Sequence, residues 1–120
     1  MKRLIKKNSL LSLNSKENFK SLFEKGSFYK ENNVGFRCWK GKNLAFYVGY
    51  TVSKKQFSKA VDRNLIKRRL KSELHRVRGC FMSACPPGVY LFYYLGNQIP
   101  LSSNLSNGIK GVIKKFIEET

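Results

Sequence analysis

Three cationic side chains follow one another at intervals of four residues: Arg63, Lys67 and Lys71. On an α-helix this spacing puts them in one row, where each pair of like charges costs roughly 0.2–0.5 kcal/mol. Phosphate groups lying along the row would remove that repulsion. The spacing therefore predicts a surface that binds a polyanion through its phosphates, and not a group that makes or breaks a bond.

The surrounding segment supports this interpretation. Residues 54–78 contain ten Lys or Arg and two acids, a net charge of +8. The alternative is a solvated basic face, but such faces normally mix charges of both signs. The candidate nucleic-acid contacts are Lys54, Lys55, Arg63, Asn64, Lys67, Arg68 and Lys71. Among them, Asn64 adds an uncharged donor and acceptor suited to fixing the register of a bound strand.

The element that positions these side chains is an amphipathic helix. If it starts near Ser58, four apolar residues share one stripe of its surface: Ile66, Leu70, Leu74 and Val77. The stripe would pack on the rest of the protein and turn the cationic row toward a partner.

Elsewhere the sequence alternates between helix and strand patterns. A first helix is predicted at residues 15–25, capped by Asn14 or Ser15 and stopped by Gly26. Its apolar face carries Phe19, Leu22 and Phe23. The other expected elements are a short strand at 27–30, a strand through Val34, Phe36 and Cys38, a hairpin turn at 41–43, an interior strand at 44–52 covered on both faces, the basic helix ending at Gly79, a strand at 89–95 and a final helix at 105–117. Gly108 and Gly111 lower the helix propensity of that last segment, so packing must stabilise it.

This order predicts an α+β fold, with a mixed sheet of about four strands packed by three helices. We expect a single domain over residues 1–120, whose residues 1–13 are basic and extended or loosely held. The chain has 24 Lys and Arg against 7 acids, a formal charge of +17, so its partner should be large and anionic. Hydrophobic residues make up 42% and indicate a folded core. No stretch reaches the ~20 apolar residues of a membrane span, which favours a cytoplasmic location.

Groups able to catalyse a reaction are scarce. The seven acids are scattered, and neither a phosphate-binding glycine loop nor a nucleophile motif is present. We therefore predict no catalytic residue in this chain. The odd number of cysteines argues against a disulfide framework. A zinc site built from His75, Cys80 and Cys85 would lack a fourth ligand and a C-x-x-C motif, so we predict no dedicated metal site.

Residues 48–74, VGYTVSKKQFSKAVDRNLIKRRLKSEL, resemble the signature of the bacterial ribonuclease P protein subunit. The family pattern V-G-x-S/T-V-S/A-K-K, followed by A-V/H-x-R-N-x-x-K-R, is matched by Val48, Gly49, Thr51, Val52, Ser53, Lys54, Lys55, Ala60, Val61, Arg63, Asn64, Lys67 and Arg68. The first-helix pattern L-x5-F-x3-F-x2-G is matched by Leu13, Phe19, Phe23 and Gly26. Together with the order of elements after Gly79, the resemblance covers nearly the whole chain.

Two positions depart from the family pattern. Leu65 stands where the family usually has the second Arg of Arg-Asn-Arg, which removes one phosphate or base contact. Lys71 stands where Arg is common, and Lys lacks the bidentate guanidinium fork. The row of charges survives both changes.

The resemblance implies an unusual left-handed β-α-β crossover through the basic helix, as in the second domain of a small-subunit ribosomal protein, and a cleft between the sheet and the first helix. The sequence alone does not give this handedness, because right-handed crossovers are the strong default. The resemblance also implies an accessory subunit, inactive alone, of an endoribonuclease whose catalytic RNA removes the 5′ leader from precursor tRNA. Its implied partners are that RNA and precursor tRNA, with one protein per RNA, and Mg²⁺ held mainly by RNA phosphates.

Phe19 and Phe23 resemble the aromatic residues against which the family's single-stranded leader lies. Stacking of this kind tolerates any base and is worth ~1–3 kcal/mol per base. The alternative is that both side chains, four residues apart on one helix face, belong to the ordinary core. Tyr47 and Tyr50 belong to the same region, with their facing undecided.

Other functions remain open on composition alone. A small ribosomal protein or another structural RNA binder would have the same basic α+β character, and the ordered motif is what separates it from the proposed subunit. An independent nuclease would cut RNA without a partner, whereas a DNA-packaging protein would bind duplex DNA as well as RNA.

Overall fold

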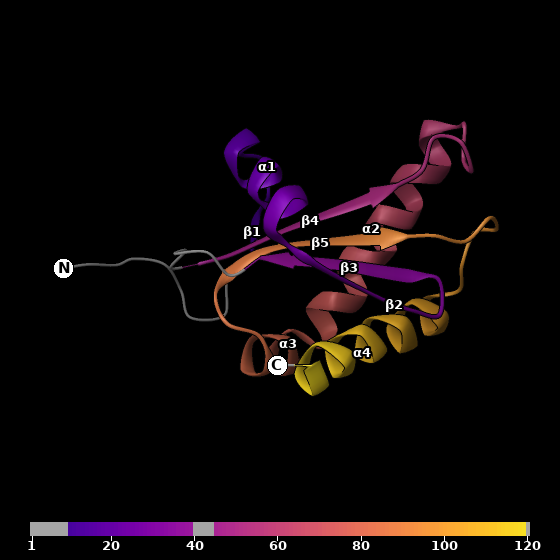
Figure 1. Ribbon diagram of the computed structural model, residues 1–120. Coiled ribbons are helices and arrows are strands. Elements are labelled where there is room, and N and C mark those ends of the chain that lie inside the picture. Colours follow the sequence, from indigo (N-terminus) through magenta and orange to yellow (C-terminus); the bar gives the residue numbers. More distant parts are fainter. Residues whose placement is uncertain (1–9, 40–44, 120) are drawn as a thin grey trace.

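The computed structural model describes residues 10–39 and 45–119 of the chain (Figure 1). Its elements in chain order are β1 (Leu10–Ser12), α1 (Lys16–Lys25), β2 (Ser27–Glu31), β3 (Val34–Trp39), β4 (Phe46–Val52), α2 (Ala60–Arg76), α3 (Arg78–Ala84), β5 (Gly88–Tyr94) and α4 (Ser102–Glu119). They form one α+β unit with a mixed sheet, as predicted. Within these residues, no helix has the length and apolar composition of a membrane span.

The strands form a single sheet in the order β1-β4-β5-β3-β2. The pairs β1–β4 and β4–β5 are parallel, whereas β3 pairs antiparallel with both β5 and β2. The parallel neighbours β4 and β5 are connected through α2 and α3, which makes this segment a β-α-β crossover. The basic helix α2 thus lies in the connection between the parallel strands β4 and β5.

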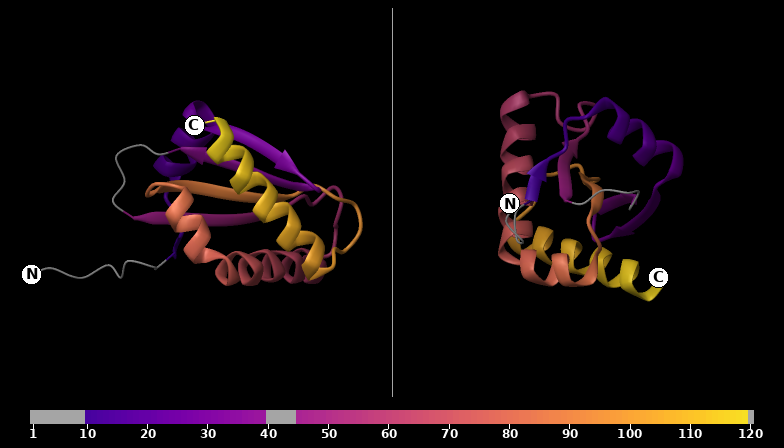
Figure 2. Two further views of the ribbon diagram at one scale, coloured as in Figure 1. Left: turned by 90° about the horizontal axis from the view of Figure 1, so that it is seen from below. Right: turned by 90° about the vertical axis from the view of Figure 1, so that its left-hand side faces the viewer.

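The two faces of the sheet are covered unequally. One face packs on α2, α3 and α4 and contains the main core, in which Phe36, Phe92 and Ile66 are fully buried. On the other face, the described residues contribute α1 and a smaller cluster around Leu22 and Leu91. Figure 2 shows α1 on one side of the sheet and the other helices on the opposite side. The partly open α1 face leaves room for a ligand.

The first helix follows its sequence signals closely. Ser15 caps α1, since its side-chain oxygen accepts a hydrogen bond from the Asn18 backbone N–H at 3.3 Å. Gly26 ends the helix, and its backbone N–H donates to the Leu22 carbonyl. Leu22 is fully buried and anchors the helix on the sheet. The predicted boundaries at 15–25 are therefore confirmed to within one residue.

The prediction of four strands and three helices is wrong by one element of each kind. Residues 10–12, expected to be extended or loosely held but not counted as a strand, form β1 beside β4. Gly79 does not end the basic helix region: α2 stops at Arg76, and Gly79 lies inside α3. The extra helix exists because it carries Phe81 into the core, where its ring packs edge-on against Tyr90 at 5.1 Å between centroids.

The strand predicted at 44–52 is observed as β4, between β1 and β5. Toward α2, Val48 and Val52 are buried and Tyr50 is half-buried, whereas Tyr47 and Thr51 toward α1 are half-buried. The face toward α2 is thus more completely covered than the face toward α1. The predicted hairpin turn at 41–43 lies outside the described residues.

The last helix lies close to the β2–β3 hairpin because two glycines face it. A Cβ at Gly108 would overlap the Val34 side chain, and one at Gly111 would overlap Glu31. An ion pair between Lys115 Nζ and Glu31 Oε1, 3.1 Å apart, also joins α4 to this hairpin. Packing thus compensates for the low helix propensity of the glycines, as predicted.

Candidate nucleic-acid interface

The basic helix turns its apolar stripe inward and its cationic row outward. Ile66, Leu70 and Leu74 are fully buried, because they recur at helical spacing and pack on the sheet. Arg63 and Lys67 are half-buried, whereas Lys71 is exposed. The remaining candidates are all exposed: Lys54, Lys55, Asn64 and Arg68. All seven predicted contacts therefore reach the surface.

The charges of these cations are not neutralised by ion pairs within the described part of the protein. Among the described residues, ion pairs join Arg76 to Glu73 and Lys115 to Glu31, and neither involves a candidate contact. A cationic surface without neighbouring carboxylates attracts phosphates more strongly than a mixed one, because the full charge meets the ligand. The row on α2 therefore has the electrostatics of a phosphate-binding surface.

Arg63 also has an internal role that the sequence did not predict. Its Nη1 donates hydrogen bonds to the carbonyl oxygens of Phe57 at 2.8 Å and of Ser58 at 2.9 Å. The residue at the N-cap of α2, Lys59, makes no side-chain capping bond. Arg63 therefore holds the entry to α2 in place and offers only part of its guanidinium to a ligand.

The loop that carries Lys54 and Lys55 is fixed at the same corner. The Ser53 side-chain oxygen accepts hydrogen bonds from the backbone N–H groups of Lys55 at 3.1 Å and Gln56 at 3.4 Å. Phe57 is buried and anchors the far end of the loop. Such a turn lowers the entropy that the two lysines lose when they bind a phosphate.

The aromatic candidates line a pocket on the α1 face of the sheet. This pocket has a volume of about 260 Å³ and is lined by Leu13, Phe19, Phe23, Gly49, Tyr50, Thr51, Leu91 and Tyr93. The rings of Phe19 and Phe23 lie 6.5 Å apart between centroids and within 14° of parallel. Phe23 is 53% exposed, so it is not an ordinary core residue. The pocket offers flat apolar surfaces of the kind on which bases stack.

The two tyrosines of β4 face opposite sides of the sheet. Tyr47 packs in the cluster around Leu22 on the α1 face. Tyr50 belongs to the opposite face, where its ring stacks on Phe92 at 6.2 Å, and burial raises the pKa of its hydroxyl above the usual value. Tyr50 nevertheless contributes to the wall of the aromatic pocket.

A second pocket connects the aromatic pocket with the basic helix. It has a volume of about 210 Å³ and is lined by Leu10, Leu11, Ser12, Leu13, Val48, Gly49, Tyr50, Lys71 and His75. The two pockets share Leu13, Gly49 and Tyr50. The two pockets therefore adjoin each other next to Leu13, one beside α1 and the other beside α2.

His75 is one of the residues that line the second pocket. Its pKa is lowered chiefly by burial, and further by the charges of Lys71 and Arg78. Among the described residues, no group of three or more His, Cys, Asp or Glu is placed to hold a metal ion.

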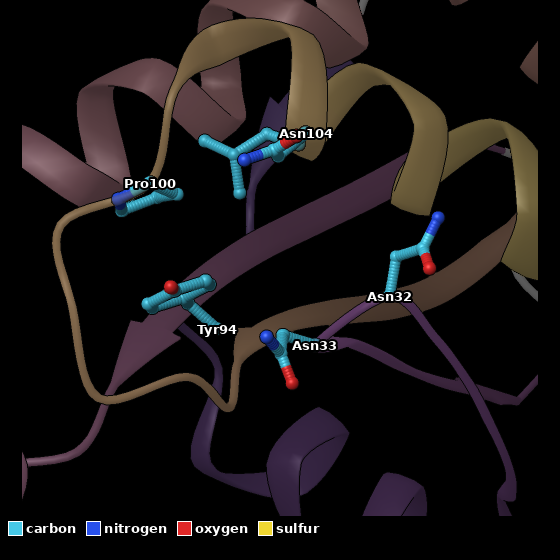
Figure 3. A pocket seen from close by; sticks show the side chains of 6 residues that line it. Asn32, Asn33, Tyr94, Pro100 and Asn104 are labelled. Atoms are coloured by element: carbon cyan, nitrogen blue, oxygen red, sulfur yellow. The ribbon is translucent and has the colours of Figure 1, made fainter.

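A third pocket lies between the β2–β3 turn and the start of α4 (Figure 3). It has a volume of about 250 Å³ and is lined by Asn32, Asn33, Tyr94, Pro100, Asn104 and Leu105. None of these residues is charged. The pocket thus lacks the phosphate-binding character of the surface around α2.

Sequence patterns missed a cation on the aromatic face. Arg37 lies on β3 with its guanidinium carbon 5.1 Å from the ring centre of Phe23 and 5.3 Å from that of Phe28. Its Nε donates a hydrogen bond to the hydroxyl of Tyr93 at 3.3 Å. The alternation of β3 contained the signal, since Phe36 and Cys38 face the core and Arg37 must face the other way.

Comparisons with known proteins agree with this geometry. The family model described as Ribonuclease P matches residues 4–94 of the chain. No curated protein matches the chain. A 2.0 Å structure of the RNase P protein of Staphylococcus aureus has 20% identity and a TM-score of 0.71, covering 88% of this chain and 94% of that one. A second structure of that protein has 19% identity and a TM-score of 0.71, covering 94% and 92%. A mutant described as having defective mRNA degradation activity has 19% identity and a TM-score of 0.70, covering 88% and 86%.

The solved structures show the same fold, and the family match spans well over half of the chain. The ordered motif from the end of β4 through α2 lies inside the matched region. The chain therefore belongs to the bacterial ribonuclease P protein family, the protein subunits of the RNA-containing endoribonuclease that removes the 5′ leader from precursor tRNA.

Proposed function

We propose that the protein works in ribonuclease P through two adjoining surfaces, one for each RNA partner. The basic surface is formed by Lys54, Lys55, Arg63, Asn64, Lys67, Arg68 and Lys71, and docks on the catalytic RNA. The leader cleft is the aromatic pocket beside Phe19 and Phe23, and holds the single-stranded leader of precursor tRNA. The observation that carries this proposal is that the aromatic pocket adjoins a second pocket, whose lining includes Lys71 and His75 of α2.

The basic surface would act by neutralising phosphates. Each contact releases condensed counterions, so the affinity for RNA falls as the salt concentration rises. Leu65 is half-buried on the same helix and adds no hydrogen bond, so the binding energy rests on the exposed cations around it.

The leader cleft would act by stacking and by the exclusion of water. The apolar rings of Phe19 and Phe23 accept any base, which suits leaders of varied sequence. Bound there, the leader is held beside the catalytic RNA and the effective concentration of substrate rises. The protein thereby promotes cleavage without supplying a reacting group.

The remaining features of the assembly follow from this division of labour. Magnesium is held by RNA phosphates, since phosphate oxygens are the hard ligands that the ion prefers. One protein binds each catalytic RNA through this basic surface. We place the protein in the cytoplasm, together with its two RNA partners.

The test separates the two surfaces by their ligands. Affinity is measured for the catalytic RNA alone, and for precursor and mature tRNA bound to the reconstituted holoenzyme. The variant Lys67→Ala with Lys71→Ala should weaken docking on the RNA, whereas Phe23→Ala should weaken binding of the precursor but not of mature tRNA.

A matched control removes the same charge elsewhere. Lys110 and Lys114 are exposed on α4 and likewise lie four residues apart, so Lys110→Ala with Lys114→Ala removes two charges outside the proposed surface. Equal loss of RNA affinity in both double variants would contradict a defined docking surface. Equal loss for precursor and mature tRNA in Phe23→Ala would contradict the leader cleft.

A further inference from the structure

We infer that Arg37 reads a guanine in the bound leader, as a specificity-determining residue of the leader cleft; this inference rests on the proposed function. The guanidinium would donate from its two terminal nitrogens to O6 and N7 of the base. This pair of acceptors is presented by guanine alone among the four bases. The aromatic rings of the cleft accept any base, so the choice is made at Arg37, which lies beside the cleft in contact with Phe23 and Tyr93.

The guanidinium is held in position before any ligand binds. It lies over the rings of Phe23 and Phe28, which attract the cation through their faces, and its Nε is bonded to Tyr93. Gly35 makes room for this arrangement, because a side chain there would press on the Phe28 ring at 2.9–3.0 Å. An Arg held in this way loses little conformational entropy on binding.

The terminal nitrogens keep their binding capacity. Within residues 10–39 and 45–119, Arg37 forms no ion pair, and its one hydrogen bond uses Nε. Both terminal NH₂ groups therefore present a planar fork with an unneutralised charge. Such a fork binds either a phosphate or the N7–O6 edge of guanine in a bidentate manner.

The stacking geometry favours the base over the phosphate. The Phe19 and Phe23 rings lie within 14° of parallel, and the guanidinium lies over Phe23. A base stacked on the face of Phe19 that is on the guanidinium's side would turn its edge toward the fork. Hydrogen bonds between a base edge and a guanidinium run in the plane of the base, whereas the phosphates of a stacked strand lie outside that plane.

The experiment uses the holoenzyme, reconstituted from the protein and the catalytic RNA. Its substrates are precursor tRNAs whose leaders contain uridine throughout, except for a single guanosine moved through each position. Dissociation constants are compared with those of matched leaders that carry adenosine instead. We expect the wild-type holoenzyme to bind one guanosine leader about tenfold more tightly than the adenosine leader.

Replacement of that guanosine by 7-deazaguanosine removes N7 and leaves the Watson–Crick edge and the stacking surface. We expect this change to abolish the preference. Arg37→Lys keeps the charge but lacks the fork, and should bind guanosine and adenosine leaders equally. Lys110→Gln, which removes a cation from the exposed side of α4, should leave the preference unchanged. Thermal melts of each variant confirm that the protein is folded.

A wild-type preference that is absent, or that survives 7-deazaguanosine or Arg37→Lys, overturns the inference. If leaders bind through the cleft without preference and Arg37→Gln weakens all of them equally, Arg37 contacts phosphate. In that case the proposed function stands while the reading of guanine fails. If precursor and mature tRNA bind equally, the leader cleft itself is wrong and the inference fails with it.

Discussion

Individual side chains of the two surfaces differ in how much of their binding capacity the fold already uses. Arg63 Nη1 already donates hydrogen bonds to two carbonyl groups at the entry to α2. By contrast, the Lys67 side chain forms no hydrogen bond or ion pair within the described residues. On α1, the fully buried Leu22 carries the packing and the 53% exposed Phe23 remains free to stack. Binding and folding are therefore separable at the level of single residues.

The contrast on α2 gives the first prediction. Lys67→Ala should weaken docking on the catalytic RNA and leave the melting temperature nearly unchanged. Arg63→Ala should weaken docking and also lower the free energy of unfolding by about 1–2 kcal/mol, because two carbonyl groups lose their donor. Denaturant unfolding and RNA-binding curves measure both quantities. A melt of Arg63→Ala that matches the wild type would contradict its internal role.

The contrast on α1 gives the second prediction. Leu22→Ala should lower the free energy of unfolding by about 2–5 kcal/mol, since it leaves a cavity in the packing beneath α1. Phe23→Ala should cost little stability and lower leader affinity by about 1–3 kcal/mol. Phe19 is half-buried, so Phe19→Ala should affect both. A large stability loss in Phe23→Ala would assign that ring to the core.

The cysteines give a prediction that depends on pH. Burial raises the pKa of the Cys85 thiol to about 12, whereas Cys80 is exposed. Thiolate is the reactive form, so alkylation of the native protein at pH 8 should modify Cys80 and spare Cys85. Because Cys85 stays protonated in the fold while the unfolded chain ionises near pH 9, its contribution to stability is lost as the pH rises above 9. Rapid alkylation of Cys85 in the native state would contradict its burial.

At the scale of elements, close contacts between helices and the sheet decide what a local pattern means. Capping and apolar periodicity predicted α1 and the inward stripe of α2, because those signals are local. Gly79 looked like a helix stop, but the need to bury Phe81 continues the chain as α3. The pairing of β1 with β4 is equally non-local, so residues 10–12 gave no clear strand pattern. The left-handed sense of the β4–β5 crossover stays a prediction.

The residues of the candidate site could be predicted from the sequence to a similar extent. A periodic row of charges is visible in a sequence, so the six candidate cations and Asn64 could be named, and the structure places all seven residues at the surface. Arg37 was missed because a single cation on a strand acquires meaning only from Phe23 and Phe28, which come from different elements. The position of the two pockets next to each other could likewise not be predicted from the sequence, since it depends on where β1 ends.

Two glycines test the packing of helices directly. Gly108→Ala should lower the free energy of unfolding by about 1–3 kcal/mol, because the added Cβ overlaps Val34 and this outweighs the gain in helix propensity. Gly79→Ala is the matched control, since a Cβ there meets nothing within 4 Å. It should leave stability unchanged or raise it by up to ~1 kcal/mol. Equal effects of the two substitutions, measured by thermal and denaturant unfolding, would contradict the close contact of α4.

At the scale of the whole molecule, we expect the charge of +17 to act both through the proposed basic surface and through general attraction to RNA. The affinity for the catalytic RNA should fall linearly on a log-log plot against salt concentration. The slope should be about −0.7 to −0.9 per phosphate contact, so Lys67→Ala should reduce it by one such increment. A binding titration at several salt concentrations measures the slope. An unchanged slope in Lys67→Ala would place the phosphate contacts elsewhere.

The most direct test of the account is the rate of leader removal at low magnesium concentration, with the catalytic RNA alone, the protein alone and the two together. We predict that the protein alone cleaves nothing, and that adding it to the RNA accelerates cleavage at the same phosphodiester bond. Cleavage by protein that is free of RNA, or no acceleration of the catalytic RNA, would contradict the assignment of binding to the protein and bond breaking to the RNA.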